Sequence, residues 1–336
     1  MAMEKPYCLK RMEGVRALIT GGLGFFGSNI AHKLVSLGAD VVIYDACLDP
    51  YGWNFANIKE IRDKVKFVKG DIRDEELMEK SVSECDIIFN CAAQVSHVDS
   101  MKDPYLDLDI NCRGQMTLLE ACRKKNDGVK IVYAGTRGQI GVMVYSPVDE
   151  NHPCMPTDVY GANKHAGELY HLLYCRVYGI KVCSIRANNT YGPRHQMKHG
   201  RYGILNWFVR KAMLGETIEV YGDGMQAREY NYIDDTVDAF ILAAQSERAW
   251  GEVFLLGSGS PVKFIDMVKA VVRAVGKGSY KIVPWPKERK SIEVGDFVVS
   301  YGKIRKMLGW EPTTNLEEGL AKTVGFYKER LAEYIN

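Results

Sequence analysis

Tyr160 and Lys164 are the residues whose types and spacing first suggest chemistry. Four residues is about one helical turn, so on a helix the phenol and the ammonium share a face. A phenol normally titrates near ~10, and a neighbouring positive charge favours the phenolate and lowers that pKa. Such a tyrosine would be a general base able to take a proton from an alcohol or sugar hydroxyl at neutral pH. The same spacing also occurs in ordinary helices that pack a tyrosine and solvate a lysine, so the prediction depends on the rest of the chain.

A second candidate is the glycine motif Gly21-x-x-Gly24-x-x-Gly27, which follows the apolar run of residues 15–20 and precedes a helical pattern over residues 28–37. After a strand and at a helix N-terminus, such glycines let backbone N–H groups approach a pyrophosphate closely. An ordinary strand-to-helix turn is the alternative. The motif therefore predicts a dinucleotide site only if other parts of that site follow.

Asp45 is one such part, because it closes the second predicted strand, residues 41–44. A carboxylate there accepts hydrogen bonds from an adenosine ribose and repels a 2′-phosphate, which favours NAD over NADP. Asp71 follows the third predicted strand, residues 65–68, where it could meet the adenine or serve as a helix N-cap. Cys91-Ala-Ala93 would form a small-residue floor at the same edge of the sheet.

The elements that must position these residues alternate between strand and helix. Two further strands are predicted at residues 87–90 and 131–133, with a helix over residues 111–125 between them and another over residues 159–178. Strands dominated by Val, Ile, Leu and Phe indicate a parallel sheet buried on both faces. We expect an α/β fold: a Rossmann-type doubly wound parallel sheet with a second, smaller α/β substrate domain.

The composition excludes several classes of protein. The 336 residues carry 44 Lys and Arg against 42 Asp and Glu, a balance that gives no electrostatic reason to expect nucleic acid or an anionic membrane as a partner. No apolar run is long enough to span a bilayer, and no signal-peptide core precedes the first strand. The nine cysteines are scattered without a C-x-x-C, which predicts no metal site and no disulfide framework. We expect a cytoplasmic protein with reduced thiols.

Taken together, the motifs resemble the extended short-chain dehydrogenase/reductase family, in its nucleotide-sugar epimerase and dehydratase branch. The segments that carry the resemblance span nearly the whole chain: Thr20-Gly-Gly-Leu-Gly-Phe-Phe-Gly27, Gly70-Asp-Ile-Arg73, Cys91-Ala-Ala-Gln94, Asn111-x-x-Gly114, Tyr133-Ala-Gly-Thr136, Tyr160-x-x-x-Lys164, Arg186-x-x-Asn189-x-Tyr-Gly-Pro193, Tyr221-Gly-Asp-Gly224 with Arg228, and Leu308-Gly-Trp310.

The resemblance implies a role for each matching residue. Thr136, Tyr160 and Lys164 would be catalytic, with Tyr160 as acid/base and Lys164 holding the nicotinamide ribose. The residues implied in binding NAD are Gly21, Gly24, Phe25, Phe26, Gly27, Asp45, Asp71, Ile72, Cys91, Ala92, Ala93, Asn111, Tyr160 and Lys164. The residues implied in binding a nucleotide-diphosphate sugar are Thr136, Asn189, Asn206 and Arg228. Helix or strand caps are the alternatives for Asn111 and Thr136, and a surface arginine is the alternative for Arg228.

The resemblance also implies a division of the chain. Residues 1–190 would form the NAD-binding domain, with residues 231–257 returning to it, and residues 191–230 and 258–336 would bind the nucleotide sugar. The helices predicted at residues 111–125 and 159–178 match those that form a four-helix dimer interface in the family, so we expect a homodimer.

Within the branch, the pattern favours an epimerase. A 4-epimerase such as UDP-glucose 4-epimerase needs only a reversible hydride transfer with Tyr160, whereas 4,6-dehydratases usually carry Asp-Glu where this chain has Arg137 and Gly138. A CDP-sugar 2-epimerase and a non-catalytic NAD-binding scaffold are the alternatives. Arg137 could contact a substrate group or pair with a neighbouring acid, and we favour the acid.

Two departures bear on the substrate. Many UDP-sugar epimerases have Arg-x-Gly-Asp in the C-terminal lobe, where the arginine meets the diphosphate, but this chain has Glu293-Val-Gly-Asp296. Gln196 stands where glucuronate epimerases tend to place an arginine for the sugar carboxylate, which favours a neutral hexose.

Overall fold

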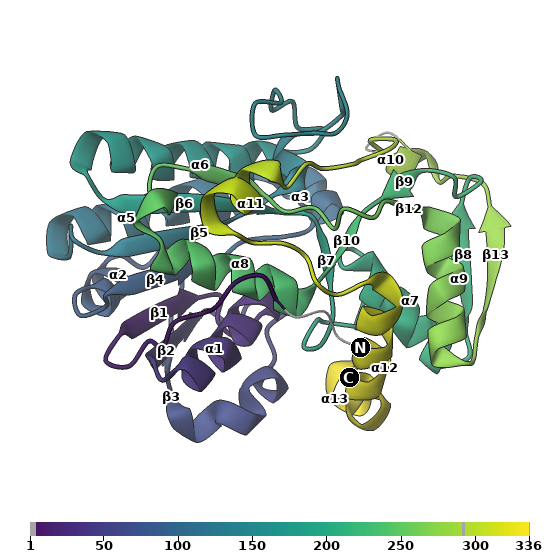
Figure 1. Cartoon of the computed structure of the whole chain (residues 1–336), viewed down its shortest axis with the longest axis horizontal. Coiled ribbons are helices and arrows are strands. Elements are labelled where there is room, and N and C mark those ends of the chain that lie inside the picture. The colour runs from purple at the N-terminus through teal and green to yellow at the C-terminus, as the bar shows by residue number, and fades with distance from the viewer. Residues whose placement is uncertain (1–4, 291–292, 336) are drawn as a thin grey trace.

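The structure, a computed structural model, describes residues 5–290 and 293–335. Its centre is a seven-stranded sheet in the order β11-β6-β5-β4-β1-β2-β3, in which every neighbouring pair is parallel (Figure 1). The strands are β1 (Arg16–Thr20), β2 (Asp40–Asp45), β3 (Val65–Lys69), β4 (Ile87–Asn90), β5 (Lys130–Thr136), β6 (Lys181–Ala187) and β11 (Val253–Leu255). The prediction of a doubly wound parallel sheet is confirmed.

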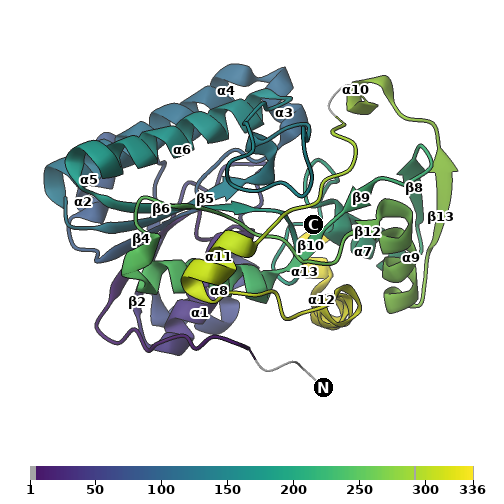
Figure 2. The ribbon, with the colours of Figure 1, turned by 45° about the horizontal axis from the view of Figure 1, so that its top comes forward.

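Helices cover both faces of this sheet, as its apolar strands require. On one face lie α1 (Phe25–Leu37) and α8 (Ile233–Gln245), and on the other lie α2 (Glu75–Val82), α5 (Gly114–Lys125) and α6 (Val159–Tyr178) (Figures 1 and 2). Helix α6 has the predicted bounds. The helix predicted over residues 111–125 begins instead as a π-helical turn, η2 (Asp109–Arg113), and becomes α-helical at Gly114. Short helical segments complete this lobe: η1 (Phe55–Lys64), α3 (His97–Lys102), α4 (Pro104–Leu108), η3 (Arg137–Gln139) and η4 (Glu247–Ala249).

A smaller lobe lies beside the carboxyl ends of the sheet strands. Its strands form three pairs: β7 (Asn189–Tyr191) with β10 (Tyr230–Tyr232), β8 (Thr217–Tyr221) with β13 (Ser279–Val283), and β9 (Ala227–Arg228) with β12 (Val262–Lys263). Its helices are α7 (Ile204–Met213), α9 (Phe264–Val275), α10 (Lys287–Lys290), α12 (Leu316–Arg330) and α13 (Ala332–Ile335). Helix α11 (Gly302–Leu308) instead packs against β11 and η4 of the large lobe, although residues 258–336 were expected to bind the nucleotide sugar. The β8–β13 pair and α9 stand at the end farthest from the large sheet (Figure 1). The chain returns to that sheet through α8 and β11, which pairs with β6.

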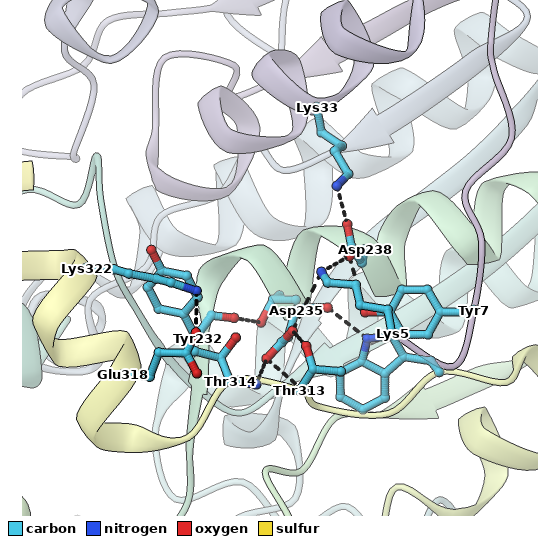
Figure 3. Close-up of polar contacts among 12 residues, drawn as sticks. Lys5, Tyr7, Lys33, Tyr232, Asp235, Asp238, Thr313, Thr314, Glu318 and Lys322 are labelled. Atoms are coloured by element: carbon cyan, nitrogen blue, oxygen red, sulfur yellow. Dashed lines mark hydrogen bonds and ion pairs between the residues drawn. The ribbon is translucent and has the colours of Figure 1, made fainter. Parts of the chain in front are cut away.

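Helix α8 ties distant parts of the chain together through two buried aspartates. Asp235 accepts hydrogen bonds from the backbone N–H groups of Thr313 and Thr314 at 3.1 and 2.9 Å, and from the Thr313 hydroxyl at 2.8 Å (Figure 3). The indole of Trp310 donates to the Asp235 carbonyl at 2.8 Å. These bonds fix the segment that leads into α12.

Asp238, one turn later on α8, holds the N-terminal segment. Its carboxylate pairs with Lys5, accepts from the Tyr7 hydroxyl at 3.2 Å, and pairs with Lys33 of α1 at 2.8 Å (Figure 3). Both aspartate side chains are about 1% exposed, and these hydrogen bonds and ion pairs match their charges inside the protein. In the part of the chain that the structure describes, no helix combines the length and hydrophobicity needed to cross a membrane.

Candidate active site

The strand order reverses between β1 and β4, and a cavity of about 740 Å³ opens at the carboxyl ends of these strands and extends between the two lobes. Such a switch point is where open parallel sheets bind their ligands. The cavity is lined by most of the residues predicted to form the site: Gly21, Gly24, Phe25, Phe26, Gly27, Asp45, Asp71, Ile72, Cys91, Ala92, Ala93, Thr136, Tyr160, Lys164, Asn189 and Arg228. Asn111 and Asn206 are not among its lining residues.

The glycine loop fits a dinucleotide pyrophosphate. Helix α1 starts directly after Gly24, and no side chain caps its N-terminus, so its first N–H groups stay available to an anion. Gly21 has a positive φ of 65°, and a Cβ there would lie 2.9 Å from the backbone of Cys91 and Ala92. Only glycine therefore lets the β1 loop lie against the floor that follows β4.

The two carboxylates predicted at the adenosine end differ in their partners. Asp45 accepts from the backbone N–H groups of Leu23 at 3.0 Å and Cys47 at 2.9 Å, and burial raises its pKa. Asp71 makes two hydrogen bonds with the Arg73 guanidinium, at 2.9 and 2.7 Å, and this arginine lowers its pKa. The N-cap of α2 is Asp74, so the alternative role of Asp71 as that cap is wrong.

Asn111 lies beneath the cavity floor. It is fully buried within the π-helical turn η2, and its amide nitrogen donates to the Gln94 carbonyl at 3.0 Å. Its position is inside a helical turn, so it is not a cap. The contact supports the backbone that follows Cys91-Ala-Ala93.

Thr136, Tyr160 and Lys164 all line the cavity. Thr136 is the last residue of β5, where its hydroxyl accepts from the Gly138 N–H at 3.2 Å and lies close enough to the Tyr160 phenol to lower its pKa. It therefore caps η3 as well as facing the cavity. Lys164 is 2% exposed, and its ammonium lies 4.1 Å from the centre of the Tyr133 ring.

The predicted lowering of the Tyr160 pKa is not a property of the protein alone. Burial raises the Tyr160 pKa, and the nearby Asp158 and Asp107 add to the increase, although the Thr136 hydroxyl opposes it. Burial also lowers the Lys164 pKa to about 8. Both charged forms are disfavoured by loss of water, which the spacing of the two residues could not reveal.

His97 and Asp158 belong to the site but were missed by sequence reasoning. The His97 ring stands edge-on to Tyr160, with centroids 4.9 Å apart, and its Nδ1 lies 2.6 Å from Asp158 Oδ2. Asp158 also caps α6 through the Gly161 N–H at 2.8 Å. Burial tends to raise the Asp158 pKa, but the hydrogen bond and charge of His97, with smaller contributions from the Gly161 N–H and Arg137, together lower it. The position of Asp158 two residues before Tyr160, at a helix start, was the available signal.

A matched ion pair lies directly beneath these residues. Glu168, one turn after Lys164 on α6, pairs with Arg186 of β6 and accepts from the Ser184 hydroxyl at 2.6 Å. Burial opposes ionisation, but His165 and Arg186 beside the carboxylate lower the Glu168 pKa to about 2. This pair fixes the lower half of α6 against the sheet.

The substrate side of the cavity holds two arginines. Arg228 pairs with Glu293 and donates to the carbonyls of Ala227 and Gly295, so the reversed charge at position 293 neutralises the arginine predicted to bind a diphosphate. Arg137 donates from Nε to Asn189 Oδ1 at 3.2 Å. Within the described residues it forms no ion pair, so the expectation that it pairs with an acid is wrong.

The side-chain amides of Asn206 and Gln196 form hydrogen bonds with the protein backbone. The Asn206 amide donates to the Gly192 carbonyl at 2.7 Å and accepts from its N–H at 3.2 Å, whereas Trp207, the next residue of α7, lines the cavity. Gln196 lines the cavity, but both ends of its amide bond to the backbone of residues 198–202. Its identity therefore carries little information about the sugar.

Comparison with known proteins identifies a matching family and several similar proteins. Residues 17–257 match the NAD dependent epimerase/dehydratase family. A putative UDP-glucose 4-epimerase of Methanocaldococcus jannaschii is 34% identical over 93% of this chain and 98% of its own length. A dTDP-glucose 4,6-dehydratase of Xanthomonas campestris is 30% identical over 92% of each chain. The crystal structure of Thermus thermophilus UDP-glucose 4-epimerase in complex with NAD is 32% identical, with a TM-score of 0.84 over 94% of this chain and all of that one.

Proposed function

The chain belongs to the NAD-dependent epimerase/dehydratase family, whose cofactor is NAD, and we propose that it is a nucleotide-sugar 4-epimerase acting on UDP-glucose and UDP-galactose or close relatives. The observation that carries this proposal is the convergence of Thr136, Tyr160 and Lys164 in one cavity where no carboxylate occupies positions 137 and 138.

In the proposed reaction, Tyr160 takes the proton of the C4 hydroxyl while the Thr136 hydroxyl, which lies beside the phenol, orients that group. Bound NAD supplies the acceptor for the C4 hydride and returns it. The 4-keto sugar would turn within the cavity, and Tyr160 would return the proton to the C4 oxygen. Burial disfavours the phenolate, so this proton transfer depends on positive charge beside Tyr160. Arg137 is the cation that lowers the Tyr160 pKa in the protein alone, and Lys164, one turn away on α6, would add to it once the substrate and cofactor are bound.

Elimination of water is the competing reaction, because dehydratases are among the relatives. By the family pattern it needs an acid and a base directly after Thr136. Arg137 is a cation, and a side chain at position 138 would press on the His97 ring, since a Cβ there would lie 3.2 Å from it. This crowding favours epimerisation.

The experiment is to incubate the purified protein with UDP-, CDP-, GDP- and dTDP-hexoses in deuterated water and follow the products by NMR. A C4 epimer of a UDP-hexose without solvent deuterium is the expected result. Deuterium at C5 with a new methyl signal would establish dehydration and reject the proposal. A C2 epimer of a CDP-sugar would replace the 4-epimerase with a 2-epimerase.

We also infer that residues 1–190 and 231–257 hold NAD, whereas residues 191–230 and 258–336 hold the nucleotide sugar. Figures 1 and 2 are consistent with this division, since β8, β9, β12 and β13 lie beyond the carboxyl ends of the large sheet. Binding of the nucleotide sugar should therefore slow hydrogen exchange at the backbone amides of residues 191–230 and 258–336 more than at those of residues 1–190 and 231–257.

A homodimer through α6 is the assembly that we propose. Three large apolar residues face outward along this helix at successive turns, namely Leu169, Leu173 and Val177, with exposed fractions of 51%, 40% and 56%. In α5 the structure exposes no large apolar side chain, so α6 would contribute most of the contact. Light scattering that finds only monomer would reject this assembly.

A further inference from the structure

Arg137 lies in the cavity wall, and its contacts leave its two terminal nitrogens available to an anion. Its guanidinium carbon lies 5.2 Å from the centre of the Phe297 ring, which is fully buried, so one face of the guanidinium is covered by an aromatic surface. Asn189 accepts from Nε at 3.2 Å and fixes the rotation of the group. The two terminal nitrogens form no hydrogen bond with any described residue, and they make a planar fork of the kind that binds a carboxylate through two parallel bonds.

The buried arginines Arg186 and Arg228 are each matched by an acid, whereas the half-buried Arg137 is not. Arg186 has Glu168 and Arg228 has Glu293, whereas no acid of the described residues lies within ion-pair distance of Arg137. Burial and the repulsion of Arg228 lower the Arg137 pKa to about 10. A charge removed from water without a partner is costly, so the missing negative charge is one that a ligand would supply.

The position of Arg137 along the cavity indicates which part of the ligand carries that charge. Arg137 directly follows Thr136, whose hydroxyl meets Tyr160 at the reacting end. On its other side Asn189 accepts from Arg137 and donates to the carbonyl of Glu229, the neighbour of Arg228, at 3.0 Å. The fork therefore lies between the C4 chemistry and the arginine expected to face a diphosphate, which is where the sugar ring must sit.

We propose that Arg137 binds a carboxylate at C6 of the sugar, so that the preferred substrate is a nucleoside diphosphate hexuronic acid. This inference rests on the proposed 4-epimerase function and specifies its substrate class. C6 is two carbons from C4, so a carboxylate there reaches the residue next to Thr136 while C4 faces Tyr160. The earlier expectation of a neutral hexose rested on Gln196, whose amide is bound to its own loop.

The test compares binding of three ligands to the NAD-loaded protein by calorimetry: UDP, UDP-glucose and UDP-glucuronate. We expect UDP-glucuronate to bind the unmodified protein about 10- to 100-fold more tightly than UDP-glucose, the range of one charge-assisted hydrogen-bonded pair. Arg137→Gln should remove this preference and leave the affinity for UDP unchanged within about threefold. Arg137→Lys, which keeps the charge but loses the fork, should retain part of it.

Arg194→Gln is the matched control. Arg194 also stacks on a phenylalanine, Phe326, at 5.4 Å and bonds an asparagine, Asn29, at 2.9 Å, but it does not line the cavity. Its loss should leave the preference for UDP-glucuronate intact. Equal affinity of the unmodified protein for the two sugars would overturn the inference, as would a loss of UDP binding in Arg137→Gln, because that result would assign Arg137 to the diphosphate.

The same samples separate the two proposals. Formation of a C4 epimer from UDP-glucose, with no preference for UDP-glucuronate, would leave the 4-epimerase in place and remove the role of Arg137. Absence of any C4 epimer from neutral and acidic UDP-sugars alike would reject the proposed function itself, whatever the affinities.

Discussion

Two buried charged residues on successive turns of α6 differ in whether a partner of opposite charge lies beside them. Glu168 has Arg186 and Ser184 at its carboxylate, and its pKa falls to about 2 despite burial. Lys164, one turn earlier, makes no hydrogen bond or ion pair with any described residue, and burial lowers its pKa to about 8. The first side chain lies in the packed layer under the cavity and the second lines the cavity.

The same contrast recurs elsewhere in the molecule. Asp235 and Asp238 on α8 are surrounded by donors from distant segments (Figure 3), whereas Arg137 and Asp45 at the cavity have no charged partner among the described residues. An unmatched buried charge costs stability, so its retention indicates a ligand that supplies the match. In these examples the matched charges of Glu168, Asp235 and Asp238 lie in the packed layers, whereas Lys164, Arg137 and Asp45 line the cavity.

The largest expected effect is on turnover. Tyr160→Phe should lower kcat by about 10²- to 10⁴-fold, the range for loss of a general acid/base, because no other group takes the C4 proton. The bound NAD content and the thermal unfolding temperature should stay close to those of the unmodified protein. Turnover within tenfold of the original would remove Tyr160 from the mechanism.

Removal of a matched charge should instead affect folding. Glu168→Gln leaves Arg186 buried without its counter-ion, and we expect a loss of about 3–5 kcal/mol in the free energy of unfolding. Urea denaturation measures this loss. Glu247→Gln is the control, because Glu247 also pairs with two cations, Lys130 and Lys181, but at an exposed site, and its unfolding midpoint should hardly change. Equal effects of the two variants would contradict the comparison.

The sequence could predict those features of the fold and the site that depend on local spacing. The glycines of residues 21–27 and the apolar strands fixed the Rossmann-type sheet, because turn geometry and hydrophobic pattern are local properties. Tyr160 and Lys164 were predicted to share a helical face, and both line the cavity. Their pKa values could not be predicted, since burial depends on the whole fold.

Long-range pairing was beyond the sequence for the same reason. Nothing in the chain near Arg228 signals that Glu293, 65 residues later, neutralises it. Asn206 was expected to face the substrate, but Gly192 takes its amide. Arg137 is the opposite case: the structure is needed to see that no acid of the described residues pairs with it.

A smaller effect, of opposite sign, is expected at Lys164. Lys164→Met keeps the length of the side chain and removes an unmatched cation, so the protein should be as stable or up to about 2 kcal/mol more stable at neutral pH, while losing activity. Because the folded-state pKa is lowered to about 8, the cost of the ammonium is fully present below pH 8 and disappears as the pH rises toward the ordinary lysine value of 10.5. Unfolding free energies of the two proteins should therefore converge from pH 8 to pH 10. Constant separation over that range would show that packing, and not charge, sets the difference.

The smallest effect separates the two carboxylates at the adenosine end. Asp45 carries a charge with no cation beside it, whereas Asp71 is matched by Arg73. A 2′-phosphate would meet repulsion from the unmatched charge and little from the matched one. Asp45→Asn should thus lower the preference for NAD over NADP by about tenfold, roughly the free energy of one weak charge interaction, and Asp71→Asn should leave it nearly constant. The measurement is the ratio of NAD to NADP bound when each nucleotide-depleted protein is reloaded from an equimolar mixture. Should Asp71→Asn change that ratio as much as Asp45→Asn, pairing with arginine would not shield a carboxylate from the ligand, and the distinction between matched and unmatched charge would fail at the cavity.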